Sequence, residues 1–405
     1  MQLKFRKKIS ARKLETLVHL GIILIAGLST ILRPSMESKI TLFRVFLPFL
    51  FLWLFVVNTK RGIKLSLIII GFFLYSLIAS YGSRFHEINW AYNFYYITIF
   101  FFYSYYKEII KRCNKESVYI FLSILYRTLI VLGLLQYFIG GVYFNTQNRF
   151  PAINLFFWNE NEYSAILAIF TPLFFLKQSS YFKYIWILLS IYLIAYNDAK
   201  LAILSLIVFF GGYLIMKFRL FRMRYIGFCL IGFIGVMVLF FTREYTIQGK
   251  YTIEYFISRL VSGLFTGTPL VHIGTFNSRS NAVITGIYEF FNSYMIGIGP
   301  GNSLLMIQEL IVPGQEKWAA YSMHNFTLQL ITEMGLFGLG MLGFFMLDIK
   351  STIRNTLYSP NLIWLFFFSC VVSITLLSGA WSNYFYLFIL FYAVDFFKNN
   401  DKSNS

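Results

Sequence analysis

Long runs of apolar residues alternate with short polar segments along most of the chain. A bilayer core of about 30 Å needs about 20 helical residues at 1.5 Å per residue, and many runs reach or approach that length. The pattern predicts about twelve transmembrane helices, over residues 17–33, 41–57, 62–81, 90–106, 117–141, 161–177, 181–197, 199–217, 224–242, 325–347, 361–378 and 380–397. The sequence therefore predicts an all-α polytopic membrane protein, with residues 1–405 forming one membrane domain.

Composition supports this class. Hydrophobic residues make up 58% of the chain and charged residues only 13%, against about 25% charged in soluble domains. A soluble globular protein is thereby excluded.

Two connections are longer than the others, residues 142–160 and residues 243–324. The second contains KYTIEYFISRLVSGLF and NAVITGIYEFFNSYMI, in which apolar residues recur at helical spacing with polar residues between them. We expect two or three amphipathic helices on the membrane surface there. The tail at 398–405 is polar and is predicted to be disordered.

The basic residues predict the orientation. With the N-terminus inside, 23 of the 35 Lys and Arg residues fall on the cytoplasmic side. Both termini are then cytoplasmic and the 243–324 loop is extracytoplasmic. The net charge of +18 reflects this topology and contact with anionic membrane lipids, and it implies no nucleic-acid partner.

The predicted outer side gathers cations from distant parts of the sequence: Arg149, Lys200, Arg259 and Arg279. Guanidinium and ammonium groups suit an anionic head group. The alternative interpretation is that each one only reaches toward lipid phosphates at the interface.

Two outer segments carry further polar chemistry. The turn GlyIleGlyProGly, with Gly299 and Gly301, is able to offer backbone N–H groups to a phosphate, or serves only to separate two helices. The segment around Asn161 places amides and carboxylates beside aromatic residues, an arrangement that suits sugar recognition. It equally suits an aromatic belt followed by a helix start.

Two ionisable residues, Arg127 and Glu333, fall well inside predicted spans. Charged groups at that depth are costly and are usually paired. Both lie at a depth of about 12 to 15 Å, so we expect them to pair or to share a polar network with a structural role.

The stretch HNFTLQLITEMGLFGL has a recognisable spacing. His324 and Asn325 are followed by nine residues, then Gly335, two more residues and Gly338. This resembles the His-[Asn/Ser/Gln]-x9-Gly-x-x-Gly signature of the superfamily of O-antigen ligases and Wzy-type polymerases.

Other motifs agree with that family in order. Asn161 resembles its asparagine, AsnAspAlaLysLeuAla at 197–202 resembles its Ser-Arg-Gly-Ala, and Arg279 with the following helix and glycine turn resembles its periplasmic-loop segment. Lys200 stands where the family usually has Arg, which keeps the charge but loses the bidentate fork.

The resemblance implies glycosyl transfer at the outer face of the bacterial cytoplasmic membrane, from an undecaprenyl diphosphate-linked oligosaccharide, without metal or other cofactor. His324 is the candidate proton acceptor for the acceptor hydroxyl, since an imidazole titrates near neutral pH. Arg279 and Lys200, supported by Arg149 or Arg259, would stabilise the leaving diphosphate. We expect Gly335 and Gly338, with Gly340 and Gly343, to allow close helix packing.

We therefore predict a polysaccharide polymerase that makes O-antigen, capsule or exopolysaccharide. A ligase that transfers finished glycan to a lipid or protein acceptor shares the same motifs. A transporter of polyprenyl glycans or small solutes is the alternative from a different class. The resemblance leaves room for a chain-length regulator as a further partner.

Overall fold

The structure is a computed structural model of the whole chain. It describes residues 11–27, 42–86, 88–113, 115–139, 153, 155, 160–177, 181–197, 199–217, 275–309, 326–353, 360–374, 386–390 and 392–393. The predicted span 224–242 and the tail 398–405 lie outside these ranges, as does the loop 243–324 apart from 275–309.

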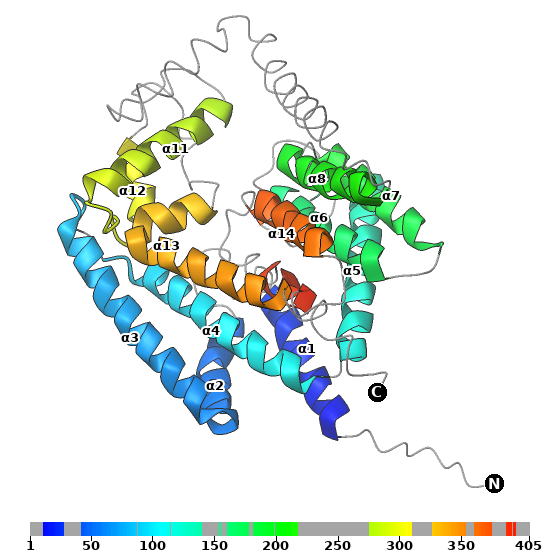
Figure 1. Cartoon of the computed structure of the whole chain (residues 1–405), viewed down its shortest axis with the longest axis horizontal. Coiled ribbons are helices and arrows are strands. Elements are labelled where there is room, and N and C mark those ends of the chain that lie inside the picture. The colour runs from blue at the N-terminus through cyan, green and yellow to red at the C-terminus, as the bar shows by residue number, and fades with distance from the viewer. Residues whose placement is uncertain are drawn as a thin grey trace, which may run out of the picture. The chain divides into compact units, whose positions relative to one another are not determined.

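Every long regular element in the described residues is an α-helix (Figure 1). The helices are α1 (Ala11–Gly27), α2 (Leu42–Val57), α3 (Thr59–Gly82), α4 (Trp90–Arg112), α5 (Lys115–Ile139), α6 (Glu160–Lys177), α7 (Lys183–Tyr196), α8 (Lys200–Lys217), α11 (Thr275–Asn292), α12 (Asn302–Glu309), α13 (Phe326–Ile353) and α14 (Pro360–Ile374). The predicted all-α class is confirmed for this part of the chain.

Three of these helices contain segments long and apolar enough to cross a membrane: Thr59–Gly82, Glu116–Ile139 and Thr327–Phe344. The apolar helices Val45–Val57, Lys183–Tyr196 and Leu201–Lys217 are shorter. From α2 to α8, the helices begin and end within a few residues of the predicted spans, except that α4 continues to Arg112. The periodicity thus located these helices, and a number of twelve crossings stays a prediction.

Helix α3 shows why an apolar helix can have an exposed face in this protein. Ile63, Leu67, Ile70, Leu74 and Ile78 follow one another at helical spacing, and each is at least half exposed. A continuous apolar stripe of this kind is unfavourable in water but matches the hydrocarbon of a bilayer.

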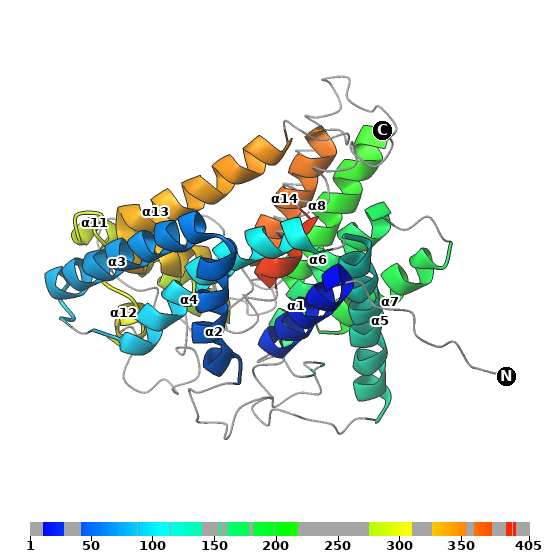
Figure 2. The same cartoon turned by 90° about the horizontal axis from the view of Figure 1, so that it is seen from below.

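The chain divides into two compact units. The first consists of residues 1–73, 94–206 and 347–405, and the second of residues 74–93 and 207–346. Within the first unit, α6 packs against α7 and α14, and α5 packs against α6 and α7. Figure 2 shows α6 and α14 side by side.

Hydroxyl groups join the helices in the core of the first unit. Tyr126 of α5 is hydrogen-bonded to Thr171 of α6 at 3.1 Å, and Thr171 to Ser190 of α7 at 2.9 Å. Tyr163 donates to the carbonyl of Leu129 at 2.9 Å. Because buried hydroxyls are costly without a partner, these bonds fix the helices in one register.

The second unit contains α11, α12 and the beginning of α13, together with the segment that follows α3. Its apolar core is built from Ile298, Met306 and Ile307, with Phe85 and Leu328 packed against them. The predicted amphipathic segment NAVITGIYEFFNSYMI does form a helix over most of its length, as α11.

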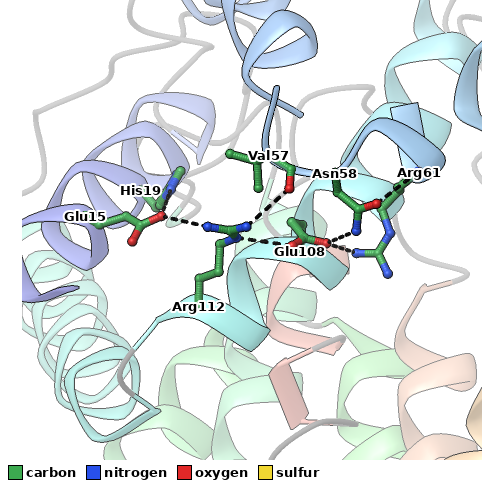
Figure 3. A network of polar contacts seen from close by, with 7 residues as sticks. All are labelled: Glu15, His19, Val57, Asn58, Arg61, Glu108 and Arg112. Carbon is green, nitrogen blue, oxygen red and sulfur yellow. Dashed lines mark hydrogen bonds and ion pairs between the residues drawn. The ribbon is translucent and has the colours of Figure 1, made fainter. Parts of the chain in front are cut away.

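A polar network in the first unit centres on Glu108 near the end of α4 (Figure 3). Its carboxylate accepts hydrogen bonds from Asn58 at 2.9 Å, from Arg61 at 2.7 Å and from Arg112 at 3.2 Å. Arg112 also lies 3.9 Å from the carboxylate of Glu15 in α1. The network therefore joins α1, the α2–α3 connection and α4.

The environment of Glu108 shifts its acidity. Burial by itself raises the pKa of Glu108, but the hydrogen bonds from Asn58 and Arg112 and the charges of Arg61 and Arg112 lower it to a greater extent. The net result is a pKa below the ordinary value. A carboxyl group whose pKa is lower in the folded state stabilises the fold above its unfolded pKa, and this contribution is lost as the pH falls through the folded pKa.

We expect Glu108→Gln to lower the stability of the detergent-purified protein at pH 7 by about 1 to 3 kcal/mol, since the charged hydrogen bonds to Arg61 and Arg112 are lost. The difference from wild type should shrink as the pH falls below the folded pKa of Glu108. Thermal unfolding at a series of pH values measures both effects. Glu116→Gln, at the exposed start of α5, is the matched control, and parallel pH profiles for Glu108→Gln and wild type would contradict this role.

Candidate functional site

Helix α13 is broken at Gly335. This residue has φ 53° and ψ −135°, which is not a helical conformation, so α13 consists of a first arm at 326–334 and a second arm at 336–353. A Cβ at Gly338 would lie 2.5 Å from the carbonyl oxygen of Leu330, a residue of the first arm. The second arm therefore starts in close contact with the first, so α13 covers the predicted span 325–347 as two arms instead of one continuous helix.

The break releases backbone groups that a continuous helix would pair internally. The turn between α11 and α12 supplies their partners. Ile298 N–H donates to the carbonyl of Thr332 at 3.0 Å, Gly299 N–H to the carbonyl of Glu333 at 2.9 Å, and Leu336 N–H to the carbonyl of Met295 at 2.8 Å. The turn at 293–301, called here the glycine turn, is thus docked on α13 through the backbone.

This docking bears on the two interpretations that the sequence left open for the turn. The N–H groups of Ile298 and Gly299 are used inside the protein, and Gly297 N–H donates to the hydroxyl of Ser293 at 3.0 Å. These amides are therefore not displayed for a phosphate. The sequence shows that a glycine turn is present, but the partners of its N–H groups come from a helix more than 30 residues later.

The glycines of the turn are needed for conformation and for space. Gly299 and Gly301 have φ values of 90° and 84°, and a Cβ on them would meet Ser80 at 2.4 Å and Asn89 at 2.8 Å. The turn therefore lies tightly against the end of α3 and the segment that follows it. Tyr75 adds a hydrogen bond of 2.8 Å to the carbonyl of Ile296 and stacks on Phe337 of the second arm.

The carboxylate of Glu333 is completely buried beside this turn. It accepts a hydrogen bond from the hydroxyl of Ser303, in the first turn of α12, and one of 3.0 Å from the amide of Gln329. The Gln329 side chain is also hydrogen-bonded to Tyr92. The sequence singled out Glu333 by its depth, whereas Ser303, Gln329 and Tyr92 carried no such signal.

The second ionisable residue of the predicted interior, Arg127, lies among aromatic rings. Its guanidinium carbon is 5.5 Å from the ring centre of Phe174 and 5.8 Å from that of Trp186, and among the residues the structure describes its Nε has no hydrogen-bond partner. These distances are typical of cation–π contacts. Arg127 belongs to the first unit and Glu333 to the second, and their pairing stays a prediction.

Asn197 joins two segments of the first unit that contain predicted site residues. Asn197 follows α7 and donates from its amide to the carbonyls of Ile153 at 2.8 Å and Glu160 at 3.4 Å and to the hydroxyl of Ser164 at 3.2 Å. It also accepts from Ile153 N–H at 2.9 Å. Asn197 thereby connects the start of α8, which is Lys200, with the first turn of α6, which contains Asn161.

The remaining predicted site residues are described only in part or not at all. Arg279 occupies the first half of α11, and the structure gives the course of its backbone. His324, Asn325, Arg149 and Arg259 lie outside the described residues, although His324 comes two residues before α13 begins. Among the described residues, no three His, Cys, Asp or Glu side chains lie together as metal ligands would.

The four glycines near the break differ in their surroundings. Gly335 and Gly338 are tightly surrounded, since a Cβ would lie 2.1 Å from the carbonyl oxygen of Met295 in the glycine turn and 2.5 Å from that of Leu330 in α13 itself. At Gly340 and Gly343 a Cβ would meet no described atom within 4 Å. Close packing at these two glycines stays a prediction.

Gly335→Ala is expected to destabilise the protein by more than about 3 kcal/mol, because the new methyl group would overlap the carbonyl of Met295 and the backbone would keep a left-handed conformation. Gly340→Ala, in the same helix and in open space, should change stability by at most about 1 kcal/mol. The yield of monodisperse protein and its thermal midpoint in detergent measure the effect. Equal values for the two variants would contradict the proposed need for glycine at the break.

Asn197→Ala should lower the thermal stability by about 1 to 3 kcal/mol, since it leaves the buried backbone groups of Ile153 without their partner. Asn197→Asp retains the oxygen that accepts from Ile153 N–H but loses the amide donor, so its loss should be of similar size. Thermal unfolding in detergent measures both. Wild-type stability in either variant would contradict the role of Asn197 as the connection between α6 and α8.

Comparisons with known proteins provide no family for this chain. No protein-family model matches the sequence, and no curated protein matches it. What the protein does must be inferred from its own residues and their arrangement.

Proposed function

We propose that the protein is a glycosyltransferase of the membrane, a polymerase that joins undecaprenyl diphosphate-linked oligosaccharide units at the outer face of the bacterial cytoplasmic membrane. The observation that carries the proposal is the spacing of His324 and Asn325 from Gly335 and Gly338. The structure gives these two glycines a physical reason, because one is the break in α13 and the other is the contact between its arms.

The arrangement of polar residues supports the topology that this function requires. Glu15, Asn58, Arg61, Glu108 and Arg112 all lie at helix ends or connections that the distribution of basic residues assigns to the cytoplasm. The structure gathers them into one network (Figure 3). This agrees with a polytopic protein of about twelve spans whose termini are cytoplasmic and whose 243–324 loop is outside.

The proposed outer side has a corresponding arrangement. Asn197 holds the start of α6 beside the start of α8, and this connection brings Asn161 and Lys200 to one end of the first unit. A carboxamide suits sugar hydroxyls and an ammonium suits a diphosphate. The two motifs of the resemblance that lie in the first unit are therefore neighbours in space.

The proposed reaction is a displacement at the anomeric carbon of the donor sugar. The acceptor hydroxyl oxygen forms a bond to that carbon, the bond from the carbon to the diphosphate oxygen breaks, and its electron pair leaves with the diphosphate. His324 takes the proton of the hydroxyl. Arg279 and Lys200, with Arg149 or Arg259 nearby, stabilise the charge that develops on the leaving group, so that no metal ion is required.

One observation favours a transporter as a second candidate. Transporters often contain helices that are broken within the membrane near polar substrate sites, and α13 has such a break beside the buried Glu333. The glycine turn, however, satisfies the freed backbone groups at Thr332 and Glu333, so these carbonyls are not open to a solute. A ligase remains the alternative within the same reaction class.

Deletion of the gene in its source bacterium should leave single repeat units where wild type shows long glycan chains. His324→Ala and Arg279→Ala should fail to restore polymer while the variants insert at the wild-type level, because proton transfer and leaving-group stabilisation are lost. His86→Ala, at an exposed histidine in no motif, is the control and should restore polymer. Gel profiles of extracted glycans measure chain length.

Four other outcomes would change the proposal. Normal polymer with both variants would contradict the mechanism. Single units retained inside the cell after deletion would indicate transport, and long chains stranded on the carrier lipid would indicate a ligase. Loss of activity of the purified protein in a metal chelator would contradict the metal-independent reaction.

A further inference from the structure

Glu333 is attached to the preceding segment of the chain at two separate points. Its backbone carbonyl accepts from Gly299 N–H in the glycine turn at 2.9 Å. Its carboxylate accepts from the hydroxyl of Ser303 in α12. One residue of the first arm therefore holds both the turn and the helix that follows it.

The carboxylate has a defined position because it is fully buried. A buried carboxyl group requires hydrogen-bond partners, and Ser303 and Gln329 provide two of them. Ser303 also belongs to the first turn of α12, where the partial positive charge of the helix end favours an anion. A side chain held by these contacts keeps one rotamer, and it holds Ser303 and Gln329 in place as well.

The contacts extend toward α11, which carries Arg279, and toward the start of the first arm, which begins two residues after His324. Gln329 lies one turn nearer to the start of the first arm, and it is bonded to Glu333 and to Tyr92. On the other side, the glycine turn continues directly from α11, and Glu289 of α11 forms a 2.8 Å ion pair with Arg84 after α3. The relative position of α11 and the first arm thus depends on the attachment at Glu333.

We propose that Glu333 is a positioning residue for the glycosyl transfer. It fixes the first arm, which begins two residues after His324, against the segment formed by α11, the glycine turn and α12, which carries Arg279. This inference rests on the proposed function. Because a displacement needs the proton acceptor and the leaving-group cation in place together, a looser attachment lowers turnover more than it lowers donor affinity.

Kinetics of purified variants in nanodiscs test the proposal, with lipid-linked units extracted from the deletion strain as the donor. Glu333→Ala should lower kcat by roughly 10- to 100-fold with a KM within about twofold of wild type. Glu333→Gln should stay within about fivefold of wild type, because its amide oxygen accepts the same hydrogen bonds. Ser303→Ala should lower kcat less than Glu333→Ala, and it replaces that variant if Glu333→Ala does not insert.

The matched control is Glu116→Ala, at the exposed start of α5, which should keep wild-type kinetics. Wild-type kcat in Glu333→Ala or Ser303→Ala would overturn the proposal. Loss of activity in Glu333→Gln equal to that in Glu333→Ala would also overturn it, since the charge itself would then be the requirement.

A distance measurement tests the positioning without reference to activity. Spin labels are placed at Phe291 in α11 and at Thr327 in the first arm, in a protein whose three native cysteines are replaced. The distance distribution should be narrow in wild type and Glu333→Gln and broad in Glu333→Ala. An equally narrow distribution in Glu333→Ala would overturn the proposal. If wild type makes no polymer but the distribution broadens, the proposed function fails while the attachment stands.

Discussion

The backbone groups freed by the break at Gly335 must find hydrogen-bond partners in apolar surroundings, and the second unit depends on how they do so. In hydrocarbon each unpaired carbonyl or N–H group costs several kcal/mol. The glycine turn meets this requirement at Thr332, Glu333 and Leu336. Its glycines follow from the same constraint, because only a backbone without a Cβ can lie so close to Ser80 and Asn89.

In each compact unit, one residue connects segments that are far apart in the sequence. In the first, the single amide of Asn197 connects the starts of α6 and α8. In the second, Glu333 connects the first arm of α13 with the glycine turn and α12. Both connections use a side chain together with backbone groups at helix ends, where the helical hydrogen bonds are incomplete. Proposed reacting groups adjoin these places in the sequence.

The sequence was informative wherever one residue type has one dominant physical consequence. Runs of apolar residues located α2 to α8, and the depth of Glu333 marked it as unusual. The sequence did not indicate which residues far apart in the chain are hydrogen-bonded to each other. Nothing in the local pattern connects Gly299 with Glu333 or Asn197 with Ile153. The sequence also left open whether the amides of the glycine turn face a phosphate, whereas those of Ile298 and Gly299 donate to α13. Similarly, Gly338 and Gly340 look alike in the sequence, yet only Gly338 meets another backbone.

The sequence by itself determined the helical class and the positions of most described helices. Hydrophobic periodicity and the cost of burying a charged residue depend on nearby residues, so both can be recognised in a single sequence. Only the tertiary structure decided that α13 is broken, which backbone groups complete the break and which side chains hold Glu333. These depend on contacts between residues far apart in the chain, where the partner is set by packing and not by spacing.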